Sequence, residues 1–197
     1  MIGESSVGVQ LQQGDHFPSV SFKFAGGETI TFPDDIPTRY AVVLFYRGHW
    51  WPQCVRQLAE WEAQKEVLAA LGCSVYAISV ATREEAQGVV DTGITFPIGY
   101  GCTKEDAETI GAWWGNHPPQ GEHIQPTEFL LRQGGIVLGS MYASGSVGRM
   151  GAEQAVNSLT NREKRRKKGL PPSINLFWVL GILTLWSGCI SSAYKYR

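Results

Sequence analysis

Apolar residues in this chain gather in short uninterrupted runs that alternate with amphipathic stretches, a pattern of alternating strands and helices. Residues 41–46 and 75–80 are two such runs, and runs of this length are typical of strands buried on both faces of a sheet. Between them, apolar side chains recur at roughly helical spacing from Val55 to Leu71. Pro52 suits the first position of that helix because its missing N–H is not needed there. We therefore predict a strand, a helix and a second strand in succession.

The rest of the chain up to about residue 160 carries the same kind of pattern. Capping residues, turn glycines and apolar spacing predict helices over residues 82–90, 103–114 and 151–159, and hairpins over residues 22–32 and 129–142. The order of these elements predicts an α/β fold, with a central mixed sheet flanked by helices and an N-terminal β-hairpin added to it.

Charge is distributed unevenly along the chain, although the formal net charge is only −1. Residues 1–160 contain 17 acidic and 9 basic residues, whereas residues 161–197 contain 8 basic residues and 1 acidic residue. Such asymmetry is typical of an appended targeting or functional segment. We therefore predict four parts: an N-terminal segment over residues 1–14, a domain over 15–160, a basic proline-containing linker over 161–174, and an apolar helix over 175–194.

The apolar segment 175–194 has the length of a membrane span and contains no charged residue. We interpret it as a membrane anchor; the alternatives are a helix packed on the domain or a partner, and an extension without a selected role. If it spans, the positive-inside rule keeps the domain cytoplasmic, because residues 162–168 are strongly basic. These residues would then contact an anionic membrane surface. Residues 1–14 lack the pattern of a signal peptide, so none is expected.

Cys54 is the strongest candidate for chemistry because of its place in this pattern. It follows the first buried strand and lies in the first turn of the predicted helix, two residues after Pro52. Unpaired N–H groups and the helix dipole at such a position stabilise a thiolate. The sequence therefore predicts a reactive thiol at Cys54, with an inert cysteine as the alternative.

Three segments together resemble the peroxiredoxin-like branch of the thioredoxin superfamily, also called the alkyl hydroperoxide reductase / thiol-specific antioxidant family. They are residues 14–18, 43–58 and 125–131, and the resemblance extends roughly from Gly14 to Leu159. It implies a thioredoxin-like fold and a thiol-dependent oxidoreductase that reduces peroxides or disulfides. It also implies an external thiol reductant, of the thioredoxin or glutathione type.

Trp51 is where the chain departs from this family. Relatives often read Trp-Cys-Pro-x-Cys where this chain reads Trp50-Trp51-Pro52-Gln53-Cys54, and typical peroxiredoxins have Thr in the position of Trp51. The departure excludes a local CxxC disulfide and removes the usual peroxide-binding hydroxyl. We expect Cys54 to be the nucleophile, with Trp51 and Pro52 beside it. The alternative that Trp51 favours is a catalytically silent thioredoxin-like binding module tethered to a membrane.

Four other residues enter the prediction with smaller weight. Cys102 lies in a loop before a helix and is the candidate resolving cysteine, whereas Cys73, at the start of a strand, is expected in the core. Pro126 resembles the cis-proline of thioredoxins, which packs opposite the active cysteine; an ordinary trans proline is the alternative. Arg149 lies in a segment that resembles one in relatives, and near the thiol it would favour the charged form.

Several other function classes fit the chain less well. The four histidines have no metal-ligand spacing, either among themselves or with the cysteines, so no metal or cofactor is expected. The basic run stands next to an apolar segment, which favours a membrane over nucleic acid as its partner. Four cysteines without paired spacing suggest a reducing compartment. A homodimer is compatible with all of this.

Overall fold

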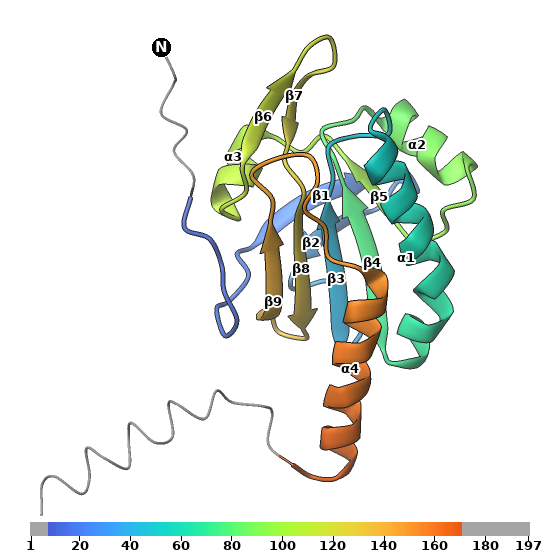
Figure 1. Cartoon of the computed structure of the whole chain (residues 1–197), viewed down its shortest axis with the longest axis vertical. Coiled ribbons are helices and arrows are strands. Elements are labelled where there is room, and N and C mark those ends of the chain that lie inside the picture. The colour runs from blue at the N-terminus through green and yellow to red at the C-terminus, as the bar shows by residue number, and fades with distance from the viewer. Residues whose placement is uncertain (1–7, 171–197) are drawn as a thin grey trace, which may run out of the picture. The chain divides into compact units, whose positions relative to one another are not determined.

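A computed structural model describes residues 8–170 of the chain, and its main feature is a seven-stranded mixed sheet (Figure 1). The strand order is β2-β1-β5-β4-β3-β8-β9. The strands are β1 (Val20–Phe24), β2 (Thr29–Phe32), β3 (Tyr40–Phe45), β4 (Cys73–Ile78), β5 (Ile98–Tyr100), β8 (Thr127–Arg132) and β9 (Ile136–Tyr142). Both predicted hairpins, β1–β2 and β8–β9, are therefore confirmed.

Strand β3 lies in the interior of the sheet, between β4 and β8, as its six consecutive buried residues require. It runs parallel to β4 and antiparallel to β8, so both of its edges are hydrogen-bonded. The register pairs Phe45 with Ile78 on one side and Leu44 with Glu128 on the other. The segment that follows Phe45 therefore starts at the edge where β4 ends and β8 begins.

The described helices are α1 (Pro52–Ala70), α2 (Arg83–Asp91), α3 (Lys104–Thr109) and α4 (Ala152–Lys167). Helix α1 starts at Pro52, as predicted, and its last turn is closed by backbone N–H groups of Leu71 and Gly72. Capping boxes at Thr82 and Thr103 open α2 and α3, because each threonine and the acid three residues later exchange side-chain hydrogen bonds with the backbone. These two helix starts are confirmed.

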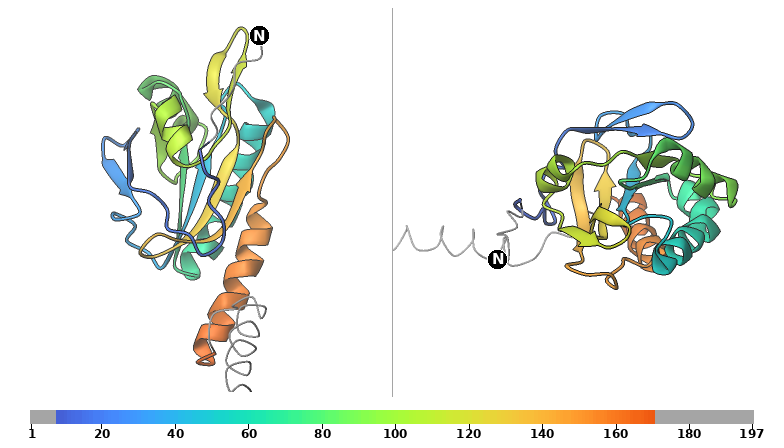
Figure 2. Two further views of the ribbon diagram at one scale, coloured as in Figure 1. Left: turned by 90° about the vertical axis from the view of Figure 1, so that its left-hand side faces the viewer. Right: turned by 90° about the horizontal axis from the view of Figure 1, so that it is seen from above.

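The two faces of the sheet are covered by different elements. Alternate residues of β3, namely Ala41, Val43 and Phe45, belong to a hydrophobic cluster with aromatic rings of the β1–β2 hairpin and with Ile110, which caps α3. Figure 2 shows the β1–β2 hairpin and α1 on opposite sides of the sheet. The first turn of α1 is therefore separated from the β1–β2 cluster by the sheet.

The predicted helix over residues 103–114 is too long. Helix α3 ends at Thr109, and Gly111 follows in the left-handed conformation (φ +72°), which glycine adopts without strain. After it comes a two-stranded sheet that the sequence pattern did not predict, β6 (Trp114–His117) and β7 (Gly121–Ile124). The three-residue strand β5 was also missed, because so short a segment shows no periodicity.

The last described helix is longer than predicted, and it takes in half of the predicted linker 161–174. Helix α4 continues to Lys167 because this stretch consists largely of good helix formers, and Arg166 pairs with Glu163 at 2.8 Å. Gly169 (φ +65°) ends it, with Gly169 N–H donating to the carbonyl of Arg166. The chain divides into two compact units between Asn157 and Ser158, within this helix.

The predicted apolar helix over residues 175–194 lies outside the described residues, and so does the predicted anchor. Within residues 8–170, no helix is both long enough and apolar enough to cross a bilayer.

Candidate functional site

Cys54 is the third residue of α1 and is completely buried. Trp51 occupies the N-cap position, Pro52 the first helical position, and Cys54 N–H donates to the carbonyl of Trp51 at 2.9 Å. The predicted helix-start position is thus confirmed, although the thiol is more deeply buried than a cysteine in an exposed first turn. A buried thiolate needs a compensating positive charge, because burial alone disfavours the charged form.

Arg149 supplies a positive charge at the sulfur. Its Nη2 donates to Cys54 Sγ at 3.1 Å, across 95 residues of sequence. The same guanidinium is fixed by its Nη1, which donates to the carbonyls of Ser146 at 3.1 Å and Gly148 at 2.7 Å. The loop between β9 and α4 therefore holds the Arg149 guanidinium against the Cys54 sulfur.

A second guanidinium, that of Arg47, lies in the loop that leads from β3 to α1. Arg47 is buried, and its Nε donates to Nε2 of His123 at 3.0 Å. Burial lowers the pKa of Arg47, the nearby charge of Arg149 lowers it further, and the interaction with Cys54 opposes both. Arg47 and Arg149 are therefore both close enough to the thiol to act on it electrostatically.

Aromatic rings pack around Arg47 and bring the β6–β7 hairpin into the site. The Arg47 guanidinium lies 4.3 Å from the ring centroid of Trp51 and 5.4 Å from that of Trp50, both within cation–π range. His117 of β6 stacks on Trp50 at 5.9 Å and meets Trp51 edge-on at 5.9 Å. His123 of β7 meets Trp50 edge-on at 5.6 Å. The hairpin thus clamps the loop before α1.

The backbone of this loop is adapted to the same packing. Gly48 has φ +152°, and a Cβ at this position would come within 2.4 Å of Nε1 of Trp50. No motif in the sequence singles out His117 or His123. The sequence signal for these contacts was the pair Trp50-Trp51, because two adjacent indole rings need packing partners from elsewhere in the chain.

Glu128 is a buried carboxyl that sequence reasoning missed. It accepts a hydrogen bond from Gln57 Nε2 at 2.5 Å and another from the backbone N–H of Met150. Burial raises its pKa to about 7, against the opposing effect of these hydrogen bonds and of the charge of Arg149. Through these two hydrogen bonds, Glu128 links Gln57 of α1, which lies three residues after Cys54, to the segment that carries Arg149. An acid inside the apolar run 127–131 was the only signal in the sequence.

The sequence profile of the AhpC/TSA family matches residues 13–139, which is well over half of the chain. The chain belongs to the AhpC/TSA family. The resemblance inferred from three sequence segments is thereby confirmed. No curated protein sequence matches the chain.

Solved structures of peroxiredoxins share the fold of this AhpC/TSA chain. Peroxidoxin BcpB from Mycobacterium tuberculosis is 15% identical with a TM-score of 0.68, over 77% of this chain and 98% of that one. AhpC from Enterococcus faecalis is 17% identical with a TM-score of 0.67, over 84% and 100%. PrxQ from Xylella fastidiosa is 16% identical with a TM-score of 0.65, over 78% and 98%. The sheet and its helices thus form a thioredoxin-like α/β fold, as predicted.

The other two described cysteines of this AhpC/TSA chain are not brought to Cys54. Cys73 pairs with Tyr40 at the start of β3, about 17 Å of strand away from the end that leads to Cys54. Cys102 is buried in the hydrophobic cluster that packs with the β1–β2 hairpin, on the face of the sheet opposite α1. Burial raises the pKa of both thiols, that of Cys73 to about 12. The arrangement gives no support to Cys102 as a resolving cysteine.

The prediction that Pro126 is a cis-proline is wrong. Among the described residues the cis peptide bonds are Phe32–Pro33 and Pro118–Pro119, so the Gln125–Pro126 bond is trans. Backbone hydrogen bonds hold the residues on both sides of this peptide bond, where β7 leads into β8. Gln125 N–H donates to the carbonyl of Trp113 at 2.8 Å, and the carbonyl of Pro126 accepts from Ala143 N–H at 2.9 Å.

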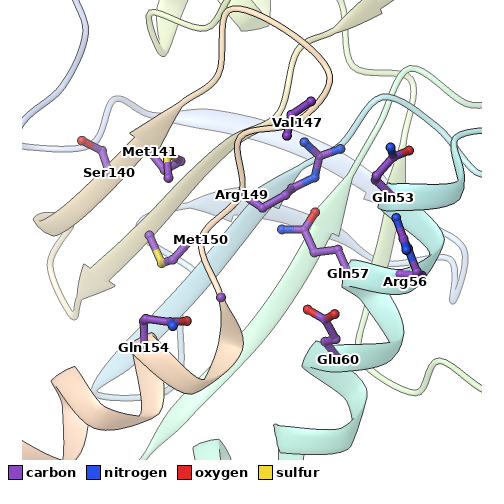
Figure 3. A pocket seen from close by; sticks show the side chains of 11 residues that line it. Gln53, Arg56, Gln57, Glu60, Ser140, Met141, Val147, Arg149, Met150 and Gln154 are labelled. Carbon is purple, nitrogen blue, oxygen red and sulfur yellow. The ribbon is translucent and has the colours of Figure 1, made fainter.

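A cavity of about 650 Å³ opens beside Arg149, between the first turns of α1 and the segment that joins β9 to α4 (Figure 3). Figure 3 shows the Arg149 side chain extending toward Gln53 and Gln57 on α1. The cavity wall formed by Arg149 is therefore one side chain away from the buried sulfur of Cys54.

Proposed function

We propose that this AhpC/TSA protein is a thiol peroxidase in which Cys54 is the nucleophile. The observation that carries the proposal is the 3.1 Å contact between Arg149 Nη2 and Cys54 Sγ at the start of α1. A cation in hydrogen-bond contact with a buried sulfur lowers the cost of ionising it. The guanidinium of Arg47, which is buried, acts in the same direction.

The reaction we propose follows from this electrostatic arrangement. The Cys54 thiolate attacks the terminal oxygen of a hydroperoxide, the O–O bond breaks, and the sulfur is oxidised to a sulfenic acid. The departing alkoxide or hydroxide takes up a proton and leaves as an alcohol or water. The two guanidiniums, fixed before the substrate arrives, stabilise negative charge as it moves from sulfur to the leaving oxygen.

Trp51 replaces the residue that carries a peroxide-binding hydroxyl in typical peroxiredoxins, and its indole Nε1–H is buried without a hydrogen-bond partner in the described structure. An unpartnered buried donor is costly, so a peroxide oxygen that accepts from it would gain binding energy. We propose that this N–H takes over part of the role of the missing hydroxyl.

The oxidised form needs an external thiol. Trp51 excludes a CxxC disulfide, and Cys73 and Cys102 are buried away from Cys54. We therefore favour a cycle with one essential cysteine and an external reductant. The catalytically silent module is disfavoured, because such a module would have no use for two arginines around a buried cysteine.

Membrane attachment is a further proposal that depends on sequence features alone. Residues 175–194 are apolar, and the basic residues 162–168 before them would interact with anionic lipids on the cytoplasmic side. Fractionation of the full chain and of a chain ending at Thr160 tests this. Recovery of the full chain in the membrane fraction, and of the shortened chain outside it, is the expected result. Recovery of both without detergent would contradict it.

The experiment that tests the enzymatic proposal is peroxide consumption by the purified full chain, with glutathione and a thioredoxin system supplied in separate assays. We expect turnover with at least one reductant and none after Cys54→Ser. Cys73→Ser is the matched control, because it removes a buried thiol at the far end of the sheet. Undiminished turnover by Cys54→Ser would contradict the proposal.

A further inference from the structure

Glu128 is a carboxyl group that the reaction proposed above does not use, in a position where a carboxyl is costly. It is completely buried and lies in β8, between β3 and β9. Phe129 and Leu131 belong to the hydrophobic cluster that packs with the β1–β2 hairpin, so strand alternation places Glu128 on the face that α1 covers. Burying a carboxyl there is unfavourable unless partners satisfy its oxygens. The partners of Glu128 therefore indicate what it does.

Each oxygen of Glu128 accepts a hydrogen bond from a different element. Oε1 accepts from Nε2 of Gln57 at 2.5 Å, and Oε2 accepts from the backbone N–H of Met150. Gln57 stands on α1 one turn after Cys54, so the two side chains leave the helix on the same side. Met150 directly follows Arg149, and the peptide bond that joins them is planar. The carboxyl group therefore connects a residue beside the thiol with the backbone beside its guanidinium.

The loop that carries Arg149 has few other attachments. Residues 144–150 belong to no helix or strand, so no ladder of backbone hydrogen bonds holds them. The Arg149 guanidinium donates to two carbonyls of the same loop, and its Nε is buried without a hydrogen-bond partner in the described structure. Within residues 8–170, the hydrogen bonds from this loop to the sheet or to α1 end on Cys54 and on Glu128. Figure 3 shows Gln57 extending from α1 toward the same loop.

An apolar residue in place of Glu128 would serve the packing of this strand better. Replacement of buried charged groups by apolar side chains of similar volume is often neutral or stabilising. Burial raises the pKa of Glu128 to about 7, whereas its two hydrogen bonds and the charge of Arg149 lower it. The carboxyl thus lies within electrostatic range of the same guanidinium that contacts the Cys54 sulfur. Its contacts, rather than its contribution to packing, account for its presence.

We propose that Glu128 is a positioning residue for the oxidation of Cys54. Its carboxyl group holds the backbone at Met150 against Gln57, and this sets the Arg149 guanidinium on the Cys54 sulfur before a peroxide arrives. Glu128 acts through Arg149 and is not itself a reacting group. The inference rests on the proposed peroxidase function and adds to it a residue on which the oxidation rate depends. Misplacement of a catalytic group by about 1 Å can slow a reaction by about 100-fold.

The rate at which hydrogen peroxide oxidises Cys54 in a single turnover measures this role. Glu128→Leu removes both hydrogen bonds and puts an apolar side chain in the buried site. Glu128→Gln can keep both, because its amide oxygen can accept from Met150 N–H while its NH₂ group donates to the side-chain oxygen of Gln57. Thr127→Val is the matched control, since it removes a different buried polar group from the same strand.

We expect Glu128→Leu to slow oxidation about tenfold, and Glu128→Gln and Thr127→Val to stay within about twofold of the wild type. A second comparison separates positioning from a general disturbance of the fold. In an Arg149→Ala background there is no guanidinium to position, so Glu128→Leu should change the rate by less than about twofold. Gln57→Leu breaks the same bridge at its other end. It should give the same pattern in the two backgrounds, and it replaces Glu128→Leu if that variant does not fold.

The outcomes distinguish this inference from the proposed function. Failure of peroxide to oxidise Cys54 in the wild type would overturn the proposed function and this inference with it. Normal oxidation of the wild type, with an unchanged rate in Glu128→Leu, would overturn the inference alone. Equal slowing by Glu128→Leu with and without Arg149 would also overturn it, because the effect would not then depend on the guanidinium. So would a rate in Glu128→Gln as low as that in Glu128→Leu, because the two hydrogen bonds would not then account for the effect.

Discussion

The surroundings of Cys54 and Cys102 differ in charge and hardly at all in burial. Cys54 is 0% exposed and Cys102 is 4% exposed. The Cys54 sulfur is contacted by the guanidinium of Arg149, whereas Cys102 lies in an apolar cluster and donates to the backbone carbonyl of Thr103. Burial, reinforced by the negative charge of Asp106, raises the pKa of the Cys102 thiol.

Two cysteines that are equally buried can therefore have opposite electrostatic surroundings. A buried thiol among apolar side chains stays protonated and behaves as a small hydrophobic residue. The same thiol beside fixed positive charge can ionise, because the charge replaces the water that burial removes. The two sides of this sheet therefore provide one site suited to chemistry and one suited to packing.

The largest expected effect tests the comparison itself. Cys54→Ser should abolish peroxide turnover, because no other described cysteine lies beside a guanidinium. Cys102→Ser should keep turnover within about twofold of the wild type, since its thiol takes no part in the reaction. Peroxide consumption by both variants checks this. Loss of turnover in Cys102→Ser, in a protein that folds normally, would show that Cys102 resolves oxidised Cys54 after a rearrangement.

Removal of the positive charge at the sulfur should have the next largest effect. Arg149→Ala should slow oxidation of Cys54 by peroxide about 100-fold or more, as expected for loss of a fixed group that stabilises developing charge. Arg149→Lys should recover part of the rate, because it keeps the charge and loses the planar fork. Stopped-flow oxidation under single-turnover conditions measures the step. An unchanged rate in Arg149→Ala would remove Arg149 from the mechanism.

Glu128 makes the free energy of unfolding depend on pH. Its pKa is raised from 4.5 to about 7, so between these values the folded protein keeps a proton that the unfolded chain releases. Its contribution to stability is therefore complete below about pH 4.5 and is lost as the pH rises to about 7, with a size of about 3 kcal/mol.

Urea unfolding of the wild type and of Glu128→Gln at about pH 5 and about pH 8 measures this effect. The free energy of unfolding of the wild type should fall between the two conditions by about 2.5 kcal/mol more than that of Glu128→Gln. Other carboxyl groups titrate in the same way in both proteins, so their effect on the free energy of unfolding cancels in the difference. Equal pH dependence in the two proteins would show that Glu128 is ionised throughout.

The smallest expected effect concerns Trp51. Trp51→Phe keeps an aromatic ring over Arg47 and removes the indole N–H. The rate of Cys54 oxidation should fall about fivefold, as for one hydrogen bond of about 1 kcal/mol. The same single-turnover measurement applies, with Trp61→Phe as a control for loss of a buried indole N–H elsewhere in α1. A rate equal to that of the wild type would show that the N–H does not bind the peroxide.

The sequence by itself determined the parts of this protein that depend on local chemistry. The unbroken apolar run of β3, the proline at the start of α1 and the capping threonines of α2 and α3 act within a few residues, so their pattern predicts the elements directly. The helix-start position of Cys54 follows from the same local pattern, and so does the family resemblance. The end of α3 was missed because the glycine that stops it lies inside a stretch of helical composition.

Only the tertiary structure decided which side chains meet at Cys54. Arg149 is 95 residues away from it in sequence, and Arg47 is 76 residues away from His123. These contacts depend on strand order and register, which place the loop after β9 and the β6–β7 hairpin at the edge where α1 begins. The fold also buries Cys102 in the hydrophobic cluster that packs with the β1–β2 hairpin, away from Cys54. A single sequence carries no direct record of such distances, because each contact is set by the packing of the whole sheet.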